Sequence, residues 1–142
     1  MRRMFIFMYY LFDFDGLMHK NIMGKIRNHK ELDIWKVSLE LVEDIYNLTG
    51  KFPVDEKFGL SQQMKRAAIS IPSNISEGAG RQSVNEFIRF LYISSGSLSE
   101  LETQLEIAVR LKLVMSSSEL EFKIIRVMQM LTKLLANLKN RK

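Results

Sequence analysis

Apolar residues recur every three or four positions from Leu32 onward, and no stretch alternates between apolar and polar residues as a half-buried strand does. This spacing predicts four helices, over residues 33–49, 60–79, 84–112 and from the serines at 116–118 to 138. Short links between them place successive helices antiparallel. The pattern therefore predicts an all-α fold, an up-down-up-down antiparallel four-helix bundle.

The second predicted helix carries Pro72 in its interior. Proline lacks the N–H that would donate to the carbonyl of Ala68, and its ring crowds the same oxygen. We therefore expect the helix to bend or break between Ala68 and Pro72. We expect Gly80 to cap this helix in a left-handed conformation, and Ser83 with Glu86 to form a capping box that opens the next helix.

Two of the helices carry more apolar surface than one bundle can bury. The first has a second apolar stripe beside its core stripe, and residues 87–93 are apolar nearly all round their helix. Large exposed apolar patches mark contacts between subunits. Alternatively, loops or the N-terminal segment cover this apolar surface. The candidate contact residues are Trp35, Leu39, Tyr46, Phe87, Ile88, Phe90 and Tyr92.

The composition is that of a compact globular domain, because 46% of the 142 residues are apolar and the chain has no Cys. The missing Cys excludes thiol catalysis and zinc fingers. Both histidines, His19 and His29, precede the bundle and have no second ligand nearby. The acids Glu100, Glu102 and Glu106 are interpreted as a solvated face. We therefore expect no enzymatic activity, no catalytic residue, no metal and no cofactor.

Charge is segregated along the chain. Of the net +5, residues 1–30 carry +4, residues 31–138 carry −2 and residues 139–142 carry +3. Within the bundle the first helix is acidic, whereas the second and fourth are basic. Without a recognition motif, such a pattern favours contact with phosphates over reading of bases. The nucleic-acid candidates are Lys65, Arg66, Arg81, Lys123, Arg126 and Lys133, with the tail residues Lys139, Arg141 and Lys142.

Two other interpretations of this charge stay open. The basic residues can form an ordinary solvated face. The acidic first helix can also pair with a basic helix of a neighbouring subunit.

Residues 1–30 are interpreted as an N-terminal extension ahead of the bundle domain at residues 31–142. Their apolar run, residues 4–12, follows two arginines as in a signal sequence, but two aspartates come next and no cleavage site of small residues appears. The run is also about half as long as a membrane span. We expect a cytoplasmic protein without membrane contact, and residues 1–22 lying upstream of the true start.

Residues 58–78 resemble the bacterial four-helix bundle family named after 23S rRNA intervening sequences. The most specific string is Ser70-Ile71-Pro72-Ser73-Asn74-Ile75-Ser76-Glu77-Gly78. Further matches lie at residues 32–36, 86–91 and 96–105. The resemblance spans about residues 31–140, and residues 1–22 have no counterpart in it.

The resemblance implies a small homo-oligomeric bundle, commonly a pentamer, with no assigned enzymatic activity. The family is similar to the accessory variability determinant of diversity-generating retroelements, a pentamer implicated in binding nucleic acid and a reverse transcriptase. RNA or DNA, and a reverse transcriptase or an RNA-processing protein, are therefore the implied partners. Two positions depart from the family pattern: Ser76 stands where Ala is frequent, and Lys112 stands where a glycine commonly ends the third helix.

We interpret the family string as structural. Pro72 sets the bend, Gly78 permits close packing, and Asn74 and Glu77 satisfy backbone groups that the proline frees; Ser70 belongs to the same set. The function predicted is a non-enzymatic, homo-oligomeric bundle whose basic surface binds or scaffolds RNA. The alternative is a structural or protein-interaction module with no nucleic-acid role.

Overall fold

The computed structural model of the chain describes residues 28–115 and 117–140, and this part contains helices and no strand. The long helices are α2 (Asp33–Thr49), α3 (Leu60–Gly80), α4 (Val84–Arg110) and α5 (Ser118–Lys139). The short 3₁₀ helices are η2 (His29–Glu31) and η3 (Val54–Phe58). The predicted all-α fold is confirmed, and every long helix begins and ends within two residues of its predicted bounds.

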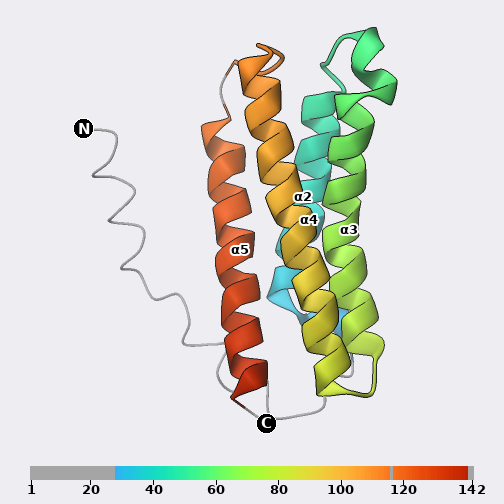
Figure 1. Cartoon of the computed structure of the whole chain (residues 1–142), viewed down its shortest axis with the longest axis vertical. Helices are drawn as coiled ribbons and strands as arrows, with labels where there is room; N and C mark the ends of the chain where they lie inside the picture. The colour runs from blue at the N-terminus through green and yellow to red at the C-terminus, as the bar shows by residue number, and fades with distance from the viewer. Residues whose placement is uncertain (1–27, 116, 141–142) are drawn as a thin grey trace, which may run out of the picture.

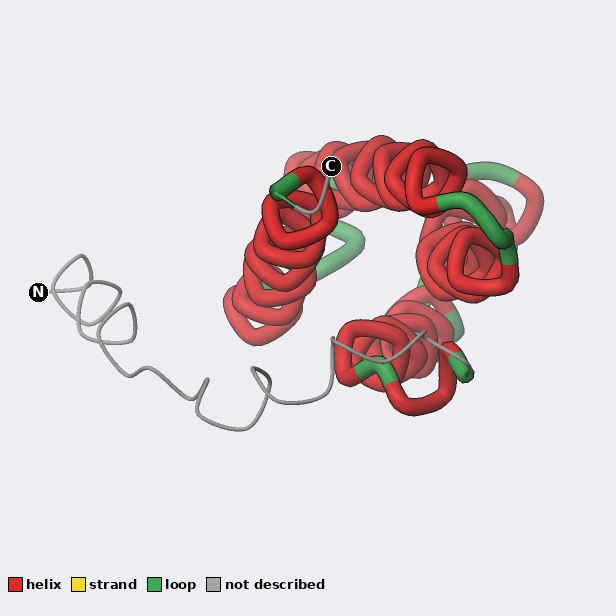
Figure 2. The backbone as a smooth tube through the Cα atoms, turned by 90° about the horizontal axis from the view of Figure 1, so that it is seen from below, coloured by secondary structure: helices red, strands yellow, loops and turns green. Residues whose placement is uncertain are grey.

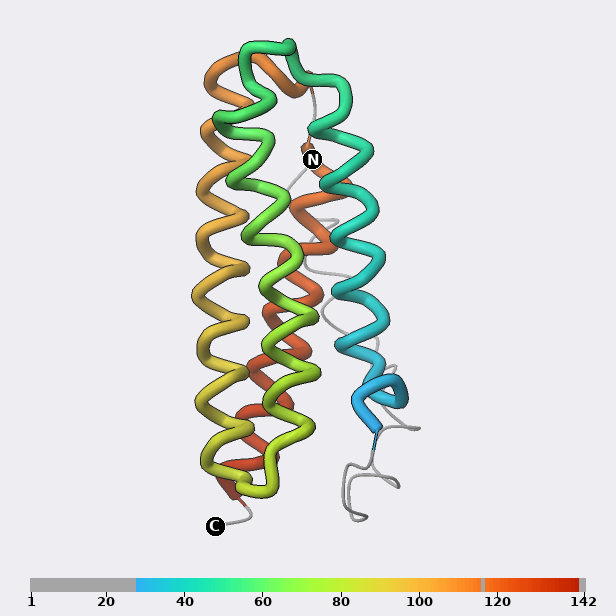
Figure 3. The backbone as a smooth tube through the Cα atoms, turned by 90° about the vertical axis from the view of Figure 1, so that its right-hand side faces the viewer, coloured from blue at the N-terminus to red at the C-terminus, as the bar shows by residue number. Residues whose placement is uncertain are grey.

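The four long helices lie side by side, and each runs opposite to the one before it (Figures 1 and 3). Viewed end-on, they surround a common axis (Figure 2). Each helix packs on the next along the chain, and α5 returns to pack on α2. Within the described residues the diagonal pairs, α2 with α4 and α3 with α5, do not pack directly.

The core consists of one apolar stripe from each helix, as the spacing predicted. The largest side chains with almost no exposure are Ile34, Leu41, Ile45, Met64, Ile71, Ile75, Leu91, Leu98, Leu101, Leu105, Ile124 and Leu131. Predicted core residues near helix ends, such as Leu48, Leu60 and Ala79, are half-buried and pack against this core. The bundle thus holds together by burial of these stripes, the dominant favourable contribution to folding.

Helix α3 continues through Pro72 without interruption, so the predicted break is wrong. Pro72 is buried, and the carbonyl of its neighbour Ile71 accepts a hydrogen bond of 3.1 Å from Ser94 Oγ on α4. Packing against α4 therefore holds this part of α3 helical despite the proline, whose isolated cost in a helix is about 3 kcal/mol. A bend at Pro72 stays a prediction.

Two predicted caps are wrong. Gly80 is the last residue of α3 and does not adopt a positive φ; the chain leaves the helix through Arg81, which is extended at φ −78° and ψ 149°. Ser83 precedes α4 as expected, but its side chain makes no capping hydrogen bond, so the capping box with Glu86 does not form. The three-residue link is short enough to turn the chain without either device.

The end of α4 does use a left-handed residue, and it is Lys112, at φ 59°. The N–H of Lys112 donates to the carbonyl of Val109 at 3.0 Å, and the N–H of Leu113 donates to that of Ala108 at 2.9 Å. This pair of bonds is the Schellman motif, in which glycine usually takes the left-handed position. The glycine that the resemblance implies at this position would fit this backbone conformation without strain.

The interpretation of residues 1–22 as an upstream extension, with the histidine at position 19, lies outside the described residues. None of the described helices is both long enough and apolar enough to cross a membrane.

Candidate nucleic-acid interface

Six of the basic candidates belong to two helices that are not neighbours in the bundle, whereas Arg141 and Lys142 lie outside the described residues. Lys65 and Arg66 lie on α3 and Arg81 directly follows it, whereas Lys123, Arg126 and Lys133 lie on α5. Helices α3 and α5 occupy diagonal corners of the bundle, and neither packs on the other. We call these two groups the α3 basic cluster and the α5 basic cluster. These six candidates therefore form two separate cationic areas.

Arg66 and Arg126 are the candidates most available to a ligand. Both side chains are exposed, and neither forms a hydrogen bond, ion pair or ring contact with a described residue. Because a guanidinium stays charged at every physiological pH and presents planar N–H donors, each offers a ready contact for a phosphate.

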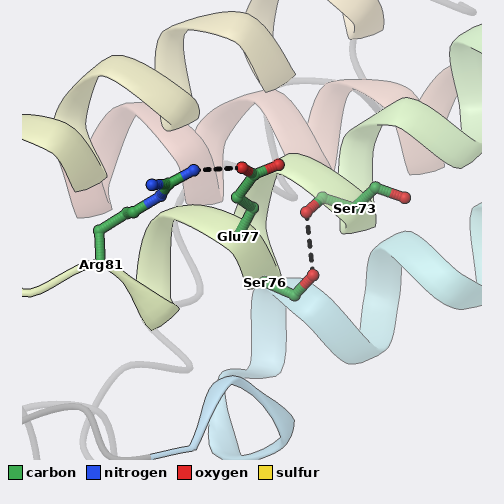
Figure 4. Close-up of polar contacts among 4 residues, drawn as sticks. All are labelled: Ser73, Ser76, Glu77 and Arg81. Carbon is green, nitrogen blue, oxygen red and sulfur yellow. Dashed lines mark hydrogen bonds and ion pairs between the residues drawn. The ribbon is translucent and has the colours of Figure 1, made fainter.

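Lys65 and Arg81 are partly engaged inside the subunit. The Nζ of Lys65 lies 4.9 Å from the centre of the Tyr46 ring, and the Arg81 guanidinium lies 5.2 Å from that of Phe90. Arg81 Nη2 also pairs with Glu77 Oε1 at 2.5 Å (Figure 4). Because the Glu77 carboxylate offsets its charge, Arg81 is a weaker phosphate candidate than Arg66.

Lys123 is not a free phosphate contact. Its side chain is half-buried between α2 and α5, where Nζ lies 2.5 Å from Asp44 Oδ2 and 3.8 Å from Glu40 Oε2. This bridge offsets the charge of the lysine, so Lys123 is a weaker phosphate candidate than Arg126, and its role in nucleic-acid binding stays a prediction. The bridge also gives part of the acidic face of α2 a partner within the same chain.

Lys133 borders a groove of about 480 Å³ between α4 and α5. Glu102, on α4, and Ile125, Met128 and Gln129, on α5, also line this groove. Lys133 is half-buried and already has an interaction within the chain. Of the α5 basic cluster, Arg126 is therefore the residue with an open charge.

The described part of the chain is electrically balanced. Residues 28–140 contain 14 Lys and Arg against 14 Asp and Glu, so the excess of +5 comes from the residues on either side of this range. Any basic surface on the bundle consequently arises from the segregation of charge between helices.

The family string packs α3 against α4 through short polar contacts. Asn74 Nδ2 donates to the carbonyl of Ser70 at 2.7 Å and to its Oγ at 2.9 Å, and Ser70 Oγ lies 2.9 Å from Ser97 Oγ on α4. Gly78 lies so close to α4 that a Cβ there would be 2.7 Å from atoms of Phe87 and Phe90. The structural interpretation of Ser70, Asn74 and Gly78 agrees with these contacts.

Glu77 does not satisfy a backbone group, contrary to the prediction, because its carboxylate pairs with the Arg81 side chain (Figure 4). Asn74 does bond a backbone carbonyl, that of Ser70, but not the Ala68 carbonyl that Pro72 frees. Ser76, where the family often has Ala, donates from Oγ to the carbonyl of Ser73 at 2.9 Å, so its hydroxyl is accommodated within the helix (Figure 4).

Some of the predicted subunit-contact residues are covered within one subunit. Phe87 and Ile88 are 5% and 7% exposed, so they offer no surface to a partner, and their assignment is corrected. Trp35 is half-buried with its ring 5.1 Å from that of His29, and Phe90 is half-buried too. The exposed members of the set are Leu39, Tyr46 and Tyr92.

Sequence reasoning missed three exposed residues. Phe58 in η3 and Phe122 on α5 are 79% and 52% exposed. Phe122 falls outside the core stripe of its helix, and the sequence alone could therefore have predicted that it is exposed. Arg89 on α4 is exposed and forms no pair with a described residue, but the net negative charge of its helix concealed it.

Within the described residues, no three His, Asp or Glu side chains are placed to hold a metal ion. The acids predicted to form a solvated face are exposed: Glu100 accepts a hydrogen bond from Gln104, and Glu106 pairs with Arg110.

Comparison with known proteins agrees with the resemblance. A family model described as 23S rRNA-intervening sequence protein matches residues 30–133. A similar solved structure is a protein of unknown function from the S23 ribosomal protein family of Bacteroides thetaiotaomicron, with a TM-score of 0.68 and 26% sequence identity. That match covers 72% of this chain and 95% of the other. No curated protein matches the chain.

Proposed function

The chain belongs to the 23S rRNA-intervening sequence protein family, and from this premise we propose that it is a non-enzymatic, homo-oligomeric bundle that binds RNA. Its surface contacts phosphates through the α3 and α5 basic clusters without reading bases. Its further partner is an RNA-processing or reverse-transcribing protein, for which the bundle is a scaffold.

The observation that carries this proposal is that Arg66 and Arg126 are exposed and have no carboxylate partner among the described residues. Both guanidinium groups are exposed and unpaired with any described residue, whereas Lys36 and Arg110 lie beside the carboxylates of Asp33 and Glu106. Cations without carboxylate partners can bind phosphate without first breaking an ion pair. They release condensed counterions from the RNA when they bind.

Oligomerisation is the second part of the proposal, and the balanced charge of the bundle makes it necessary. Within the described residues, one subunit brings three unpaired arginines, Arg66, Arg89 and Arg126, on three different helices, which is too little to hold RNA at moderate salt. Repetition around an oligomer, such as the pentamer that the family resemblance implies, multiplies these positions. Exposed Leu39 and Ile69 line a groove of about 260 Å³ between α2 and α3 and, with exposed Tyr46 on α2, support a contact with a second subunit.

The test is the salt dependence of binding to a blunt RNA duplex, measured by fluorescence anisotropy from about 50 to 200 mM salt. We expect the affinity of the wild type to fall steeply with salt. The double variant Arg66→Ala/Arg126→Ala should lower affinity equally for unrelated duplex sequences. It should also reduce the log–log salt slope by about one for each phosphate that the protein no longer neutralises.

The matched control is Lys36→Ala/Arg110→Ala, which removes two exposed cations that have carboxylate partners. This variant should bind like the wild type. If duplex RNA is not retained even at low salt, or if both double variants lose affinity equally, the RNA-binding proposal is wrong. The protein-interaction alternative then stands, and light scattering tests the oligomer separately.

A further inference from the structure

A second group of cations lies at one end of the bundle and combines charge with exposed aromatic rings. Figure 1 shows α3 and α5 ending, and α4 beginning, at this same end. The residues concerned are Arg81, Arg89, Phe90, Tyr92 and Lys139, which we call the α4 basal surface.

Two cations from neighbouring helices lie over two rings of α4. Arg81, directly after α3, has its guanidinium carbon 5.2 Å from the centre of the Phe90 ring. Lys139, at the end of α5, has its Nζ 5.2 Å from the centre of the Tyr92 ring, and Tyr92 is still 50% exposed. Each of the two rings therefore has one cation over it, and the two pairs lie on different sides of α4.

Arg89 adds a third cation between them. It is exposed, forms no pair with a described residue, and lies three positions before Tyr92, so both side chains lie on one side of the helix. The acids of α3 and α4 near this end are Glu77, which pairs with Arg81, and Glu86, which is exposed; Glu31 and Asp33 lie at the same end of the bundle, at the start of α2. Arg89 and Lys139 consequently remain as cations without a carboxylate partner among the described residues.

The other exposed tyrosine with a cation over its ring provides a contrast. Tyr46 is 46% exposed beneath Lys65, but it lies on α2 near Glu40, Glu43 and Asp44. A nucleic-acid strand at Tyr46 would meet these carboxylates, whereas at Tyr92 it would meet Arg89 and Lys139. The electrostatic setting therefore favours Tyr92.

Resting on the proposed function, we propose that the α4 basal surface binds single-stranded RNA, with a base stacked on Tyr92 and the adjoining phosphates on Arg89 and Lys139. Stacking on an aromatic ring requires an unpaired base, because the faces of bases in a duplex are already covered by their neighbours. The basic clusters of α3 and α5 hold only phosphates, so the two kinds of surface differ in the RNA that they prefer.

The experiment compares two probes on the full chain, a labelled 20-nucleotide oligouridine and the blunt duplex, both at low salt. Tyr92→Ala should weaken oligouridine binding by about fivefold or more, because one stacked base loses its ring. Its duplex binding should change by less than about twofold. Tyr92→Phe should keep the wild-type affinity, since it preserves the ring, and Arg89→Ala should weaken oligouridine binding.

Phe58→Ala is the matched control, because this ring is 79% exposed and also lies under a lysine, Lys57, but has Asp55 and Glu56 nearby in the sequence; it should bind oligouridine like the wild type. Equal losses in Phe58→Ala and Tyr92→Ala, or no loss in Tyr92→Ala, overturn the inference. A change of molar mass in Tyr92→Ala also overturns it, because the ring then belongs to a subunit contact. If the wild type binds the duplex and not oligouridine, the inference fails while the proposed function stands; if it binds neither, both fail.

Discussion

Gly78 lies at the closest approach of α3 and α4, and its missing side chain makes that approach possible. A Cβ at this position would come within 2.7 Å of Phe87 Cδ2 and of Phe90 Cβ. Phe87 is buried, so its ring has little room to move away. The last residue of the family string thus determines how close the two helices can lie.

We expect Gly78→Ala to destabilise the protein by about 1–3 kcal/mol, the usual cost of forcing an extra carbon into a packed site. Urea denaturation followed by circular dichroism measures the change. Gly80→Ala is the control, because nothing lies within 4 Å of a Cβ there, and it should change stability by less than about 0.5 kcal/mol. An equally mild effect at both positions would contradict the close contact.

Lys112 is the opposite case, because it carries a side chain at a position whose backbone conformation favours glycine. Its φ of 59° belongs to the left-handed region, which costs a residue with a Cβ about 1–2 kcal/mol relative to glycine. We expect Lys112→Gly to increase the free energy of unfolding by about 1 kcal/mol, a net value that includes the greater freedom of glycine in the unfolded chain. Thermal unfolding should show this gain as a higher midpoint temperature. Lys112→Ala, which keeps a Cβ, should give no such gain; a gain of the same size would show that removal of the lysine charge is the cause.

At the scale of the element, α3 shows why the sequence could predict where a helix lies and yet not whether it continues through a proline. The apolar period gave its bounds, and Pro72 suggested a break by local rules alone. The continuity of α3 depends on residues more than twenty positions away, among them Ser94, whose hydroxyl bonds the carbonyl beside the proline. Local propensity carries no information about such a partner.

The contribution of this bond can be measured by substitution. Ser94 is fully buried, and we expect Ser94→Ala to cost about 1 kcal/mol by leaving the Ile71 carbonyl with one fewer donor. Ser99→Ala is the matched control on the same helix, since Ser99 is exposed and bonds only its own helix, at the carbonyl of Ser95. Chemical denaturation of both variants checks this; equal stabilities would mean that the bond across the helices contributes nothing.

At the scale of the whole molecule, the fold followed from the sequence far more completely than the candidate site did. Periodicity identifies which residues are apolar on one side of a helix, and that is sufficient for a bundle. It does not say which cation meets which carboxylate across two helices. Lys123 therefore seemed available from its helix alone, although it is bound by Asp44, and Arg89 was overlooked because only the total charge of its helix was considered.

The packing order of the helices also bears on how the chain reaches its folded state. Because each helix packs on its sequence neighbour, nearly all interhelical contacts join segments that emerge consecutively during synthesis. Such low contact order is typical of chains that fold within about microseconds to milliseconds. Only the docking of α5 on α2 joins the two ends of the bundle, and it must wait for the last helix to leave the ribosome. Until α5 has emerged, Glu40 and Asp44 on α2 therefore lack Lys123, the cation that lies beside them in the folded bundle.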